Sequence, residues 1–348
     1  MNDTPVIAYL CTRNVFMGGE YYRATRAAAL LNRNFGWGTA VCDRMATSID
    51  DDGGKLSFVT PNDMVVTPDI IVIRPVAEWR QHWSDQAREN GQIVVADLDD
   101  DVFSHPVWDS AVAPPEDYYN EWVWNVDAML VSTPYLKKRL EDLGHKAPVF
   151  VAPNLYDPHG LAAHPGPGRI IGTRLWLSGR MSGDLEMYGE LFKPLLEELD
   201  LTWLHLGAEK GHSFTDEGWD PARLIERQSV IIPYFPRALE GLSIGAIAMS
   251  DHPYNLAKTE THAFELAAMG VPLVAASTHI LYKNIPGCVA PTADAVRERV
   301  TALLEPMFWR EESAKARQWA RRIAARNEAE HLVAITQMVK QLQWSLVK

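Results

Sequence analysis

Cysteine is scarce in this sequence of 348 residues, and its three copies, Cys11, Cys42 and Cys288, are far apart. So few scattered cysteines cannot build a disulfide framework or a cysteine-rich zinc cluster. The sequence also has no run of 18 apolar residues, and its first residues lack the basic and apolar regions of a signal peptide. We therefore expect a cytoplasmic protein without a transmembrane segment.

Positive charge is in deficit. The 33 Lys and Arg residues against 45 Asp and Glu residues give a net charge of −12. This balance disfavours DNA or RNA as a partner, because proteins that bind phosphate backbones usually carry a basic surface. The sequence also contains no H-E-x-x-H and no C-x-x-C, which leaves zinc-protease and dithiol redox chemistry without support.

Apolar runs of strand length alternate with helical patterns along the whole chain, which is typical of parallel α/β units. In the first half, strands are predicted at residues 6–11, 69–74, 93–99, 128–133 and 149–153. In the second half, strands are predicted at residues 170–177, 201–207, 229–235, 243–250 and 271–277, with helices at 184–199 and 260–269.

The stretch 154–169 is rich in Pro, Gly and His and is the best linker candidate. We predict two doubly wound, Rossmann-like α/β domains facing a central cleft, at residues 1–158 and 166–308, with ligands at the carboxyl ends of the strands. A C-terminal helical segment, residues 309–348, is predicted to pack across both domains. Its charged stretch 315–330 is either a solvated helix face or a basic acceptor-binding surface.

The segment 243–277 carries the most informative polar residues. A predicted strand leads into a loop with Asn255, Lys258 and Thr259, and the helix that follows has Glu265 among apolar residues. Lys258, Thr259 and the helix N-terminus suit an anion. Glu265 suits the diol of a ribose, as carboxylates do at such crossovers in dinucleotide sites. The alternative is a salt-bridged glutamate and a solvated lysine.

A second turn between strand and helix contains Ser178, Gly179 and Arg180. Glycine allows a phosphate to approach the backbone closely, and arginine binds phosphate through two hydrogen bonds. The alternative is an ordinary turn in which Asp184 caps the next helix.

The first loop of the chain contains Gly18 and Gly19, followed by Tyr22 and Arg23. The two glycines either admit a ligand to the backbone or only form a turn.

Four aspartates lie at the end of the predicted strand 93–99, among them Asp99 and Asp100. Such carboxylates position a hydroxyl, act as a base, bind a divalent metal or simply form a solvated acidic loop. A metal site would need further oxygen ligands that the sequence does not supply, so we predict no metal.

Taken together, these segments resemble the GT-B glycosyltransferases of the family-four type, closest to a branch of stand-alone bacterial and phage enzymes. The residues 254–277, YNLAKTETHAFELAAMGVPLVAAS, resemble that branch's phosphate-and-ribose motif, and 175–188, LWLSGRMSGDLEMY, its donor diphosphate turn. The segments 18–30 and 94–103 resemble the first loop with its helix and the di-aspartate strand end. The wider family has a further glutamate where this chain has Ala257.

The resemblance implies sugar transfer from a UDP- or GDP-linked donor to an acceptor hydroxyl of a glycan, a lipid-linked or another small acceptor. A retaining reaction without an obligatory metal or other cofactor is expected. Lys258, Arg180 and two helix N-termini would stabilise the leaving diphosphate, and Asp100 would contact acceptor or donor sugar. The expected donor-binding residues are Gly18, Gly19, Ser178, Gly179, Arg180, Asn255, Lys258, Thr259 and Glu265; those for the acceptor are Tyr22, Arg23 and Asp99.

Two alternatives remain open. One is a phage-type enzyme that glycosylates hydroxymethylated bases in DNA, which the net charge disfavours. The other is a non-catalytic nucleotide-binding subunit with the same fold, favoured by the alanine at position 257.

Overall fold

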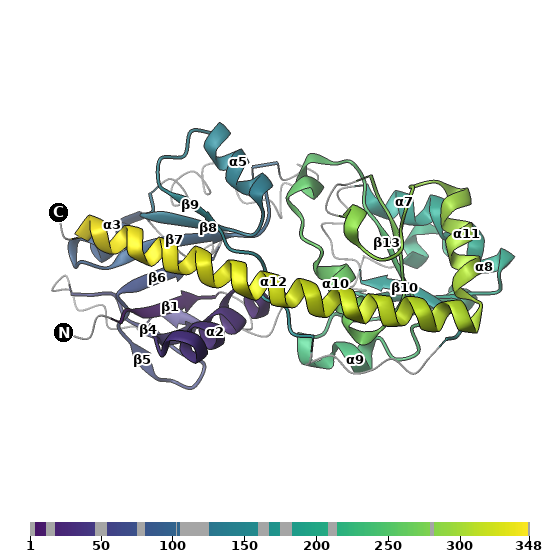
Figure 1. The fold of residues 1–348 in the computed structure, drawn as a ribbon, viewed down its shortest axis with the longest axis horizontal. Coiled ribbons are helices and arrows are strands. Elements are labelled where there is room, and N and C mark those ends of the chain that lie inside the picture. Colours follow the sequence, from purple (N-terminus) through teal and green to yellow (C-terminus); the bar gives the residue numbers. More distant parts are fainter. Residues whose placement is uncertain are drawn as a thin grey trace. The chain divides into compact units, whose positions relative to one another are not determined.

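The structure, a computed structural model, describes residues 4–11, 18–45, 54–74, 81–101, 103–104, 125–158, 167–174, 183–207, 214–278 and 282–346. It contains two compact units (Figure 1). Unit 1 is Met1–Leu155 with Arg326–Lys348, and unit 2 is Tyr156–Ala325. The division after Leu155 falls inside the stretch 154–169. Within the described ranges, no helix combines the length and the apolar character needed to cross a bilayer.

Unit 1 is built on a six-stranded parallel sheet with the order β2-β1-β6-β7-β8-β9. The strands are β1 (Val6–Leu10), β2 (Gly38–Cys42), β6 (Ile70–Ile73), β7 (Ile93–Leu98), β8 (Ala128–Val131) and β9 (Val149–Val151). A small antiparallel sheet joins β3 (Arg44–Met45), β4 (Phe58–Val59) and β5 (Val65–Val66). The helices are α1 (Gly18–Glu20), the π-helix η1 (Tyr21–Thr25), α2 (Arg26–Phe35), α3 (Gln81–Glu89) and α5 (Pro134–Asp142).

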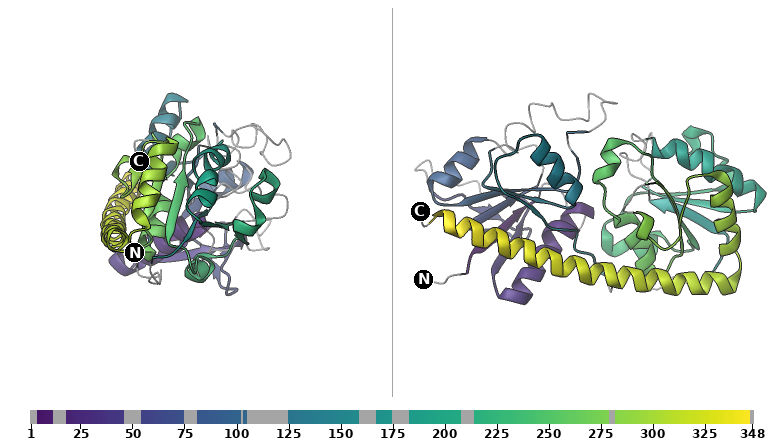
Figure 2. Two further views of the ribbon diagram at one scale, coloured as in Figure 1. Left: turned by 90° about the vertical axis from the view of Figure 1, so that its right-hand side faces the viewer. Right: turned by 45° about the horizontal axis from the view of Figure 1, so that its top comes forward.

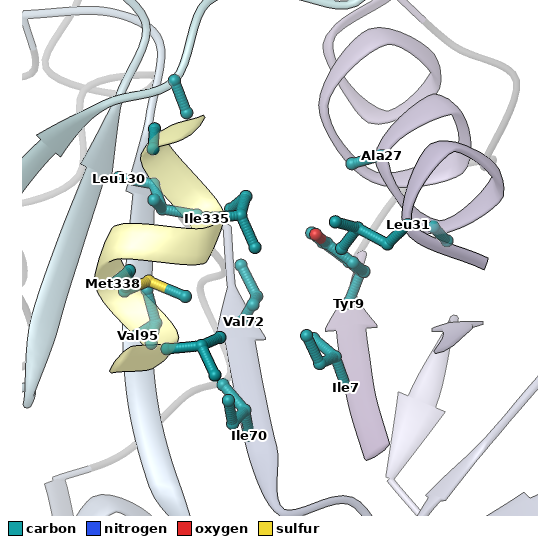
Figure 3. Packing of buried hydrophobic residues seen from close by; sticks show 14 of the residues in the cluster. Ile7, Tyr9, Ala27, Leu31, Ile70, Val72, Val95, Leu130, Ile335 and Met338 are labelled. Atoms are coloured by element: carbon teal, nitrogen blue, oxygen red, sulfur yellow. The ribbon is translucent and has the colours of Figure 1, made fainter. Parts of the chain in front are cut away.

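One face of this sheet carries alternate strand residues that pack against α2 and the end of the long helix α12 (Pro306–Leu346). Figure 3 shows Ala27 and Leu31 of α2 beside Tyr9 of β1, and Ile335 and Met338 of α12 over the neighbouring strands. Because successive side chains of a strand point to opposite faces, the other half of each strand is buried on the far side. Burial on both faces explains the continuous apolar runs in the sequence.

Unit 2 repeats the plan with the strand order β12-β11-β10-β13-β14-β15, also parallel. Figure 2 shows the ribbon from two further sides. The strands are β10 (Ile170–Arg174), β11 (Thr202–Leu206), β12 (Leu224–Arg227), β13 (Ile244–Ala248), β14 (Leu273–Ala276) and β15 (Cys288–Val289). The α-helices are α7 (Asp184–Leu191), α8 (Lys193–Glu198), α9 (Phe235–Ala238), α10 (Thr261–Met269), α11 (Ala293–Leu303) and the part of α12 that ends at Ala325. Short 3-10 helices are η2 (Phe214–Glu217), η3 (Pro221–Arg223), η4 (Ile232–Tyr234), η5 (Pro253–Ala257) and η6 (Tyr282–Asn284).

The predicted class, two doubly wound α/β domains followed by a C-terminal helical segment, is confirmed. One predicted strand is wrong: residues 229–235 form no strand but contain η4 and the start of α9. Pro233 and Pro236 lie in the first turns of these two helices. Proline lacks the amide hydrogen that an inner strand must donate, and its fixed φ suits the first turn of a helix. The strand of this region is β12, just before it.

Candidate functional site

The order of strands points to one edge of each sheet. In unit 1 the chain adds β2 on one side of β1 and then continues with β6 on the other side, so the switch point lies between β1 and β6. In unit 2 the switch point lies in the same way between β10 and β13. In open parallel sheets, ligands bind at the carboxyl ends of the strands at such a switch point. The predicted loop motifs follow β1, β10 and β13, and the predicted aspartates follow β7, the strand next to β6.

In unit 2, the loop after β13 is held in place by buried polar groups. Asp184, the first residue of α7, accepts hydrogen bonds through Oδ1 from the Ser250 amide (2.7 Å) and from Asn255 Nδ2 (2.9 Å). Asn255 Nδ2 also donates to the Ser250 carbonyl at 3.1 Å. Asp184 and Asn255 are both buried. Asn255 therefore shapes the loop, and Asp184 anchors it to the first turn of α7, whose N-cap residue is Gly183.

Lys258 and Thr259 follow η5 directly, and only Glu260 separates them from α10. Both are half-buried. Lys258 Nζ lies 3.1 Å from the Tyr254 hydroxyl and 4.4 Å from the centre of its ring, and Thr259 Oγ1 lies 2.8 Å from Thr261 Oγ1. The structure thus brings Lys258 and Thr259 together at the N-terminus of a nine-residue helix, where amide hydrogens favour an anion.

Glu265 is not a free carboxylate. Nη1 of Arg174, the last residue of β10, donates to both of its oxygens at 2.7 and 2.6 Å. Both side chains are buried, with 6% of Arg174 and 2% of Glu265 exposed. The Arg174 guanidinium also lies 4.4 Å from the centre of the Phe235 ring. The salt-bridged glutamate that the sequence left as an alternative is what the structure shows, and any ribose contact must coexist with this ion pair.

His262 is a further polar residue of this region that the sequence analysis missed. It lies in the first turn of α10, is half-buried, and precedes Glu265 by three residues. Desolvation, together with the positive charges of Arg174 and Lys258, holds the pKa of His262 well below its ordinary value. The imidazole is therefore uncharged at neutral pH.

Three predicted donor residues, Ser178, Gly179 and Arg180, lie outside the described residues. Gly183, the residue before α7, is described and has a left-handed backbone with φ 81°. The predicted diphosphate turn is thus described only from Gly183 onward.

In unit 1, the corresponding edge holds a buried charge cluster. Arg23 donates from Nε to both oxygens of Asp97 (2.9 Å each) and from Nη1 to the Ala152 carbonyl (2.6 Å) and to Asn154 Oδ1 (3.1 Å). Tyr22 and Arg23 are each 1% exposed. Tyr22 and Arg23, which were predicted to contact the acceptor, therefore lie beneath the surface, and Arg23 neutralises the charge of Asp97 there. Their role in acceptor binding stays a prediction.

Arg74, at the carboxyl end of β6, links the Arg23–Asp97 pair to the carboxylate of Asp99. It lies 3.4 Å from Asp97, 3.0 Å from Asp99 and 3.8 Å from Glu20. Asp99 is the more accessible member, with 22% of its side chain exposed, whereas Asp97 is almost fully buried.

Gly19 lies against the side chains of Arg74 and Asp99. A Cβ at this position would lie 2.7 Å from Arg74 Nη2 and 3.0 Å from Asp99 Oδ2. Gly18 and Gly19, the predicted glycine pair, are the first two residues of the short helix α1. The groups that approach the Gly19 backbone closely are the side chains of Arg74 and Asp99.

The neighbouring aspartates differ in environment. Asp100 is half-buried. Asp101 is fully buried and accepts hydrogen bonds from the amides of Phe103 and Ser104, both at 3.1 Å. A solvated acidic loop is therefore not what the structure shows. Within the described ranges, no group of three or more His, Cys, Asp or Glu residues is arranged to hold a metal.

Arg74 and Arg174 escaped the sequence analysis. Arg74 carries one signal, because it ends the apolar run 69–74, whereas Arg174 lies inside the predicted strand 170–177 and carries none. One further sequence pattern does not mark a catalytic site. Residues 241–245 match G-x-S-x-G, the signature of hydrolase nucleophiles. Ser243 is buried at the start of β13, the opposite end from the one where a nucleophile elbow would form.

Comparison with solved structures places this fold. Sucrose-phosphate synthase from Thermosynechococcus elongatus has a TM-score of 0.66 at 12% sequence identity, covering 97% of this chain and 99% of that chain. A glycosyltransferase from Rickettsia africae ESF-5 has a TM-score of 0.59 at 14% identity, with coverages of 97% and 99%. A protein described as a UDP-N-acetylglucosamine 2-epimerase from Listeria monocytogenes has a TM-score of 0.54 at 12% identity, covering 97% of both chains.

No protein-family model matches the chain, and no curated protein matches it in sequence. The structural comparison shows that the chain shares the GT-B fold of the solved structures over nearly its whole length. At 12 to 14% identity the likeness shows the fold, and the chemistry has to be argued from the site.

Proposed function

We propose that the protein is a glycosyltransferase of the family-four type that moves a sugar from a UDP- or GDP-linked donor to an acceptor hydroxyl, with retention and without an obligatory metal. The observation that carries this proposal is the placement of Lys258 and Thr259. They lie at the N-terminus of α10, beside the switch point of unit 2, in a chain with the fold of known glycosyltransferases.

The difficult step in such a transfer is departure of the nucleoside diphosphate, because negative charge develops on the bridging oxygen as the bond to the sugar breaks. Fixed positive groups lower this barrier. Lys258 supplies a full charge, and the amides of the first turn of α10 supply oriented dipoles. Arg180 is proposed to act on the same diphosphate. Asn255 contributes by fixing the loop that carries Lys258.

The ribose role of Glu265 is proposed with the Arg174 ion pair in place. Arg174 keeps the buried carboxylate charged, and a carboxylate has acceptor positions for about four hydrogen bonds in total. The 2′- and 3′-hydroxyls of the ribose would donate to the same two oxygens. A wild-type protein that binds UDP and 2′-deoxy-UDP equally well would show that Glu265 has no such role.

For the acceptor, Asp99 and Asp100 are the proposed contacts, since both are half-buried at the carboxyl end of β7. A carboxylate there accepts the hydrogen bond of an acceptor hydroxyl and orients it for reaction. Arg74 holds Asp99 at 3.0 Å and restricts its rotation. In this proposal, Arg23 and Tyr22 support the cluster from below, and Gly19 leaves room for the Arg74–Asp99 pair.

Titration calorimetry with UDP and with GDP tests the proposal. Wild type should bind at least one of them, and Lys258→Ala should bind it about ten- to a hundredfold more weakly, the value of a charge-assisted hydrogen bond. Lys138→Ala is a matched control, because Lys138 is exposed on α5 of unit 1. No binding by wild type, or equal losses in both variants, would refute the proposal.

The same protein separates the alternatives. Nucleotide binding without turnover across a broad panel of donors and acceptors would favour the non-catalytic binding subunit. Binding to DNA with a steep dependence on salt concentration would favour the DNA glycosyltransferase, and no DNA binding at low salt would remove it.

A further inference from the structure

A single imidazole lies among the cations of the proposed donor site. His262 and Glu265 are three residues apart on α10 and so lie on one face of the helix, the face that Glu265 turns toward Arg174. Lys258 precedes His262 by four residues. His262 is half-buried and has no hydrogen-bond partner among the residues that the structure describes.

The surrounding charges define what this ring can bind. They are Arg174 at the end of β10, Lys258 after η5, Glu260 at the N-cap of α10 and Glu265 on the helix. Glu265 is neutralised by Arg174, whereas the positive charges of Arg174 and Lys258 lower the pKa of the His262 imidazole. A helix N-terminus with cations nearby favours an anion, and an anion would reverse the electrostatic penalty on a charged imidazole.

We propose that His262 is a further contact of the donor diphosphate and that it binds a proton when the diphosphate binds. This inference rests on the proposed function and deepens it. The proton comes from the buffer and adds to the imidazole, so that both ring nitrogens carry a hydrogen and at least one donates to a phosphate oxygen. The added charge stabilises the bound diphosphate and the leaving nucleoside diphosphate alike.

Calorimetry in buffers with different ionisation enthalpies counts the protons taken up on binding. Inorganic pyrophosphate, UDP and GDP are the probes, and pyrophosphate makes the result independent of the nucleobase. The variants are His262→Gln, which keeps a polar side chain, and His145→Gln, a control on a half-buried histidine of unit 1. The titration of the nucleotide itself cancels in the difference between wild type and variant, and thermal melts confirm that each variant is folded.

On binding a probe between pH 6 and 7, wild type should gain as much as about one proton more than His262→Gln. The His145→Gln control should behave as wild type. At pH 6 the His262→Gln variant should bind about tenfold more weakly, with a smaller difference at pH 8.5. Equal proton uptake and equal affinity in wild type and His262→Gln would overturn the inference alone. A wild type that binds none of the three probes would overturn the proposed function, and this inference with it.

Discussion

The Arg174–Glu265 ion pair allows the sharpest prediction about the architecture of unit 2. Two hydrogen bonds of 2.7 and 2.6 Å join the side chains, of which 6% and 2% are exposed. Removing one partner of such a buried pair leaves an uncompensated charge in the protein interior. Arg174→Gln and Glu265→Gln should therefore each lower the free energy of unfolding by about 3 to 5 kcal/mol.

The two single variants should respond differently to pH. In Arg174→Gln the abandoned carboxyl can take up a proton and become neutral, so this variant should lose less stability at pH 5 than at pH 8. In Glu265→Gln the remaining guanidinium cannot lose its charge, so its loss should not depend on pH in this range. The double variant Arg174→Gln/Glu265→Gln carries no charge and should regain most of the lost stability.

Urea unfolding, followed by the fluorescence of the buried tryptophans Trp203 and Trp219 in unit 2, measures these differences. Arg297→Gln is the control, because its ion pair with Glu198 is exposed on both sides and should contribute only about 0 to 1 kcal/mol. Single variants as stable as the control, or a double variant less stable than both single ones, would refute the reasoning about this pair.

Two further predictions concern unit 1. Burial, and then the charge of Arg23, lower the pKa of His331 from 6.5 to about 4. The folded protein thus resists protonation that the unfolded chain accepts, so stability should fall as pH drops from 6.5 to 4, by up to about 3 kcal/mol from this residue. His331→Gln should flatten that part of a pH series of urea melts; an unchanged slope would contradict it. Gly19→Ala should cost about 1 to 3 kcal/mol, since its Cβ must displace the Arg74–Asp99 pair; a melting temperature equal to wild type would contradict this.

The sequence was sufficient for the fold class because strands buried on both faces give unmistakable apolar runs. It failed at residues 229–235, where an apolar run is interrupted by Pro233 and Pro236. It also missed β2 and β12, whose residues are mostly half-buried and hence less uniformly apolar. Hydrophobic pattern reports burial, so strands at or near sheet edges are the ones it overlooks.

At the candidate site, the sequence located the residues but not their partners. It placed Lys258 and Thr259 at a helix N-terminus, which local spacing determines. It could not foresee that Arg174 binds Glu265 across 91 positions or that Arg74 joins Asp97 to Asp99. Such contacts depend on the order in which strands pair, and no local signal carries that order.

Consumption of nucleotide sugars tests the central claim most directly. Purified protein is incubated with a panel of UDP- and GDP-linked sugars, alone and with mixed hydroxyl acceptors, and release of the nucleoside diphosphate is followed. Wild type should release UDP or GDP from at least one donor, with Lys258→Ala slower by about tenfold or more. A wild type that releases no nucleoside diphosphate from any donor, or a Lys258→Ala variant as fast as wild type, would contradict the account.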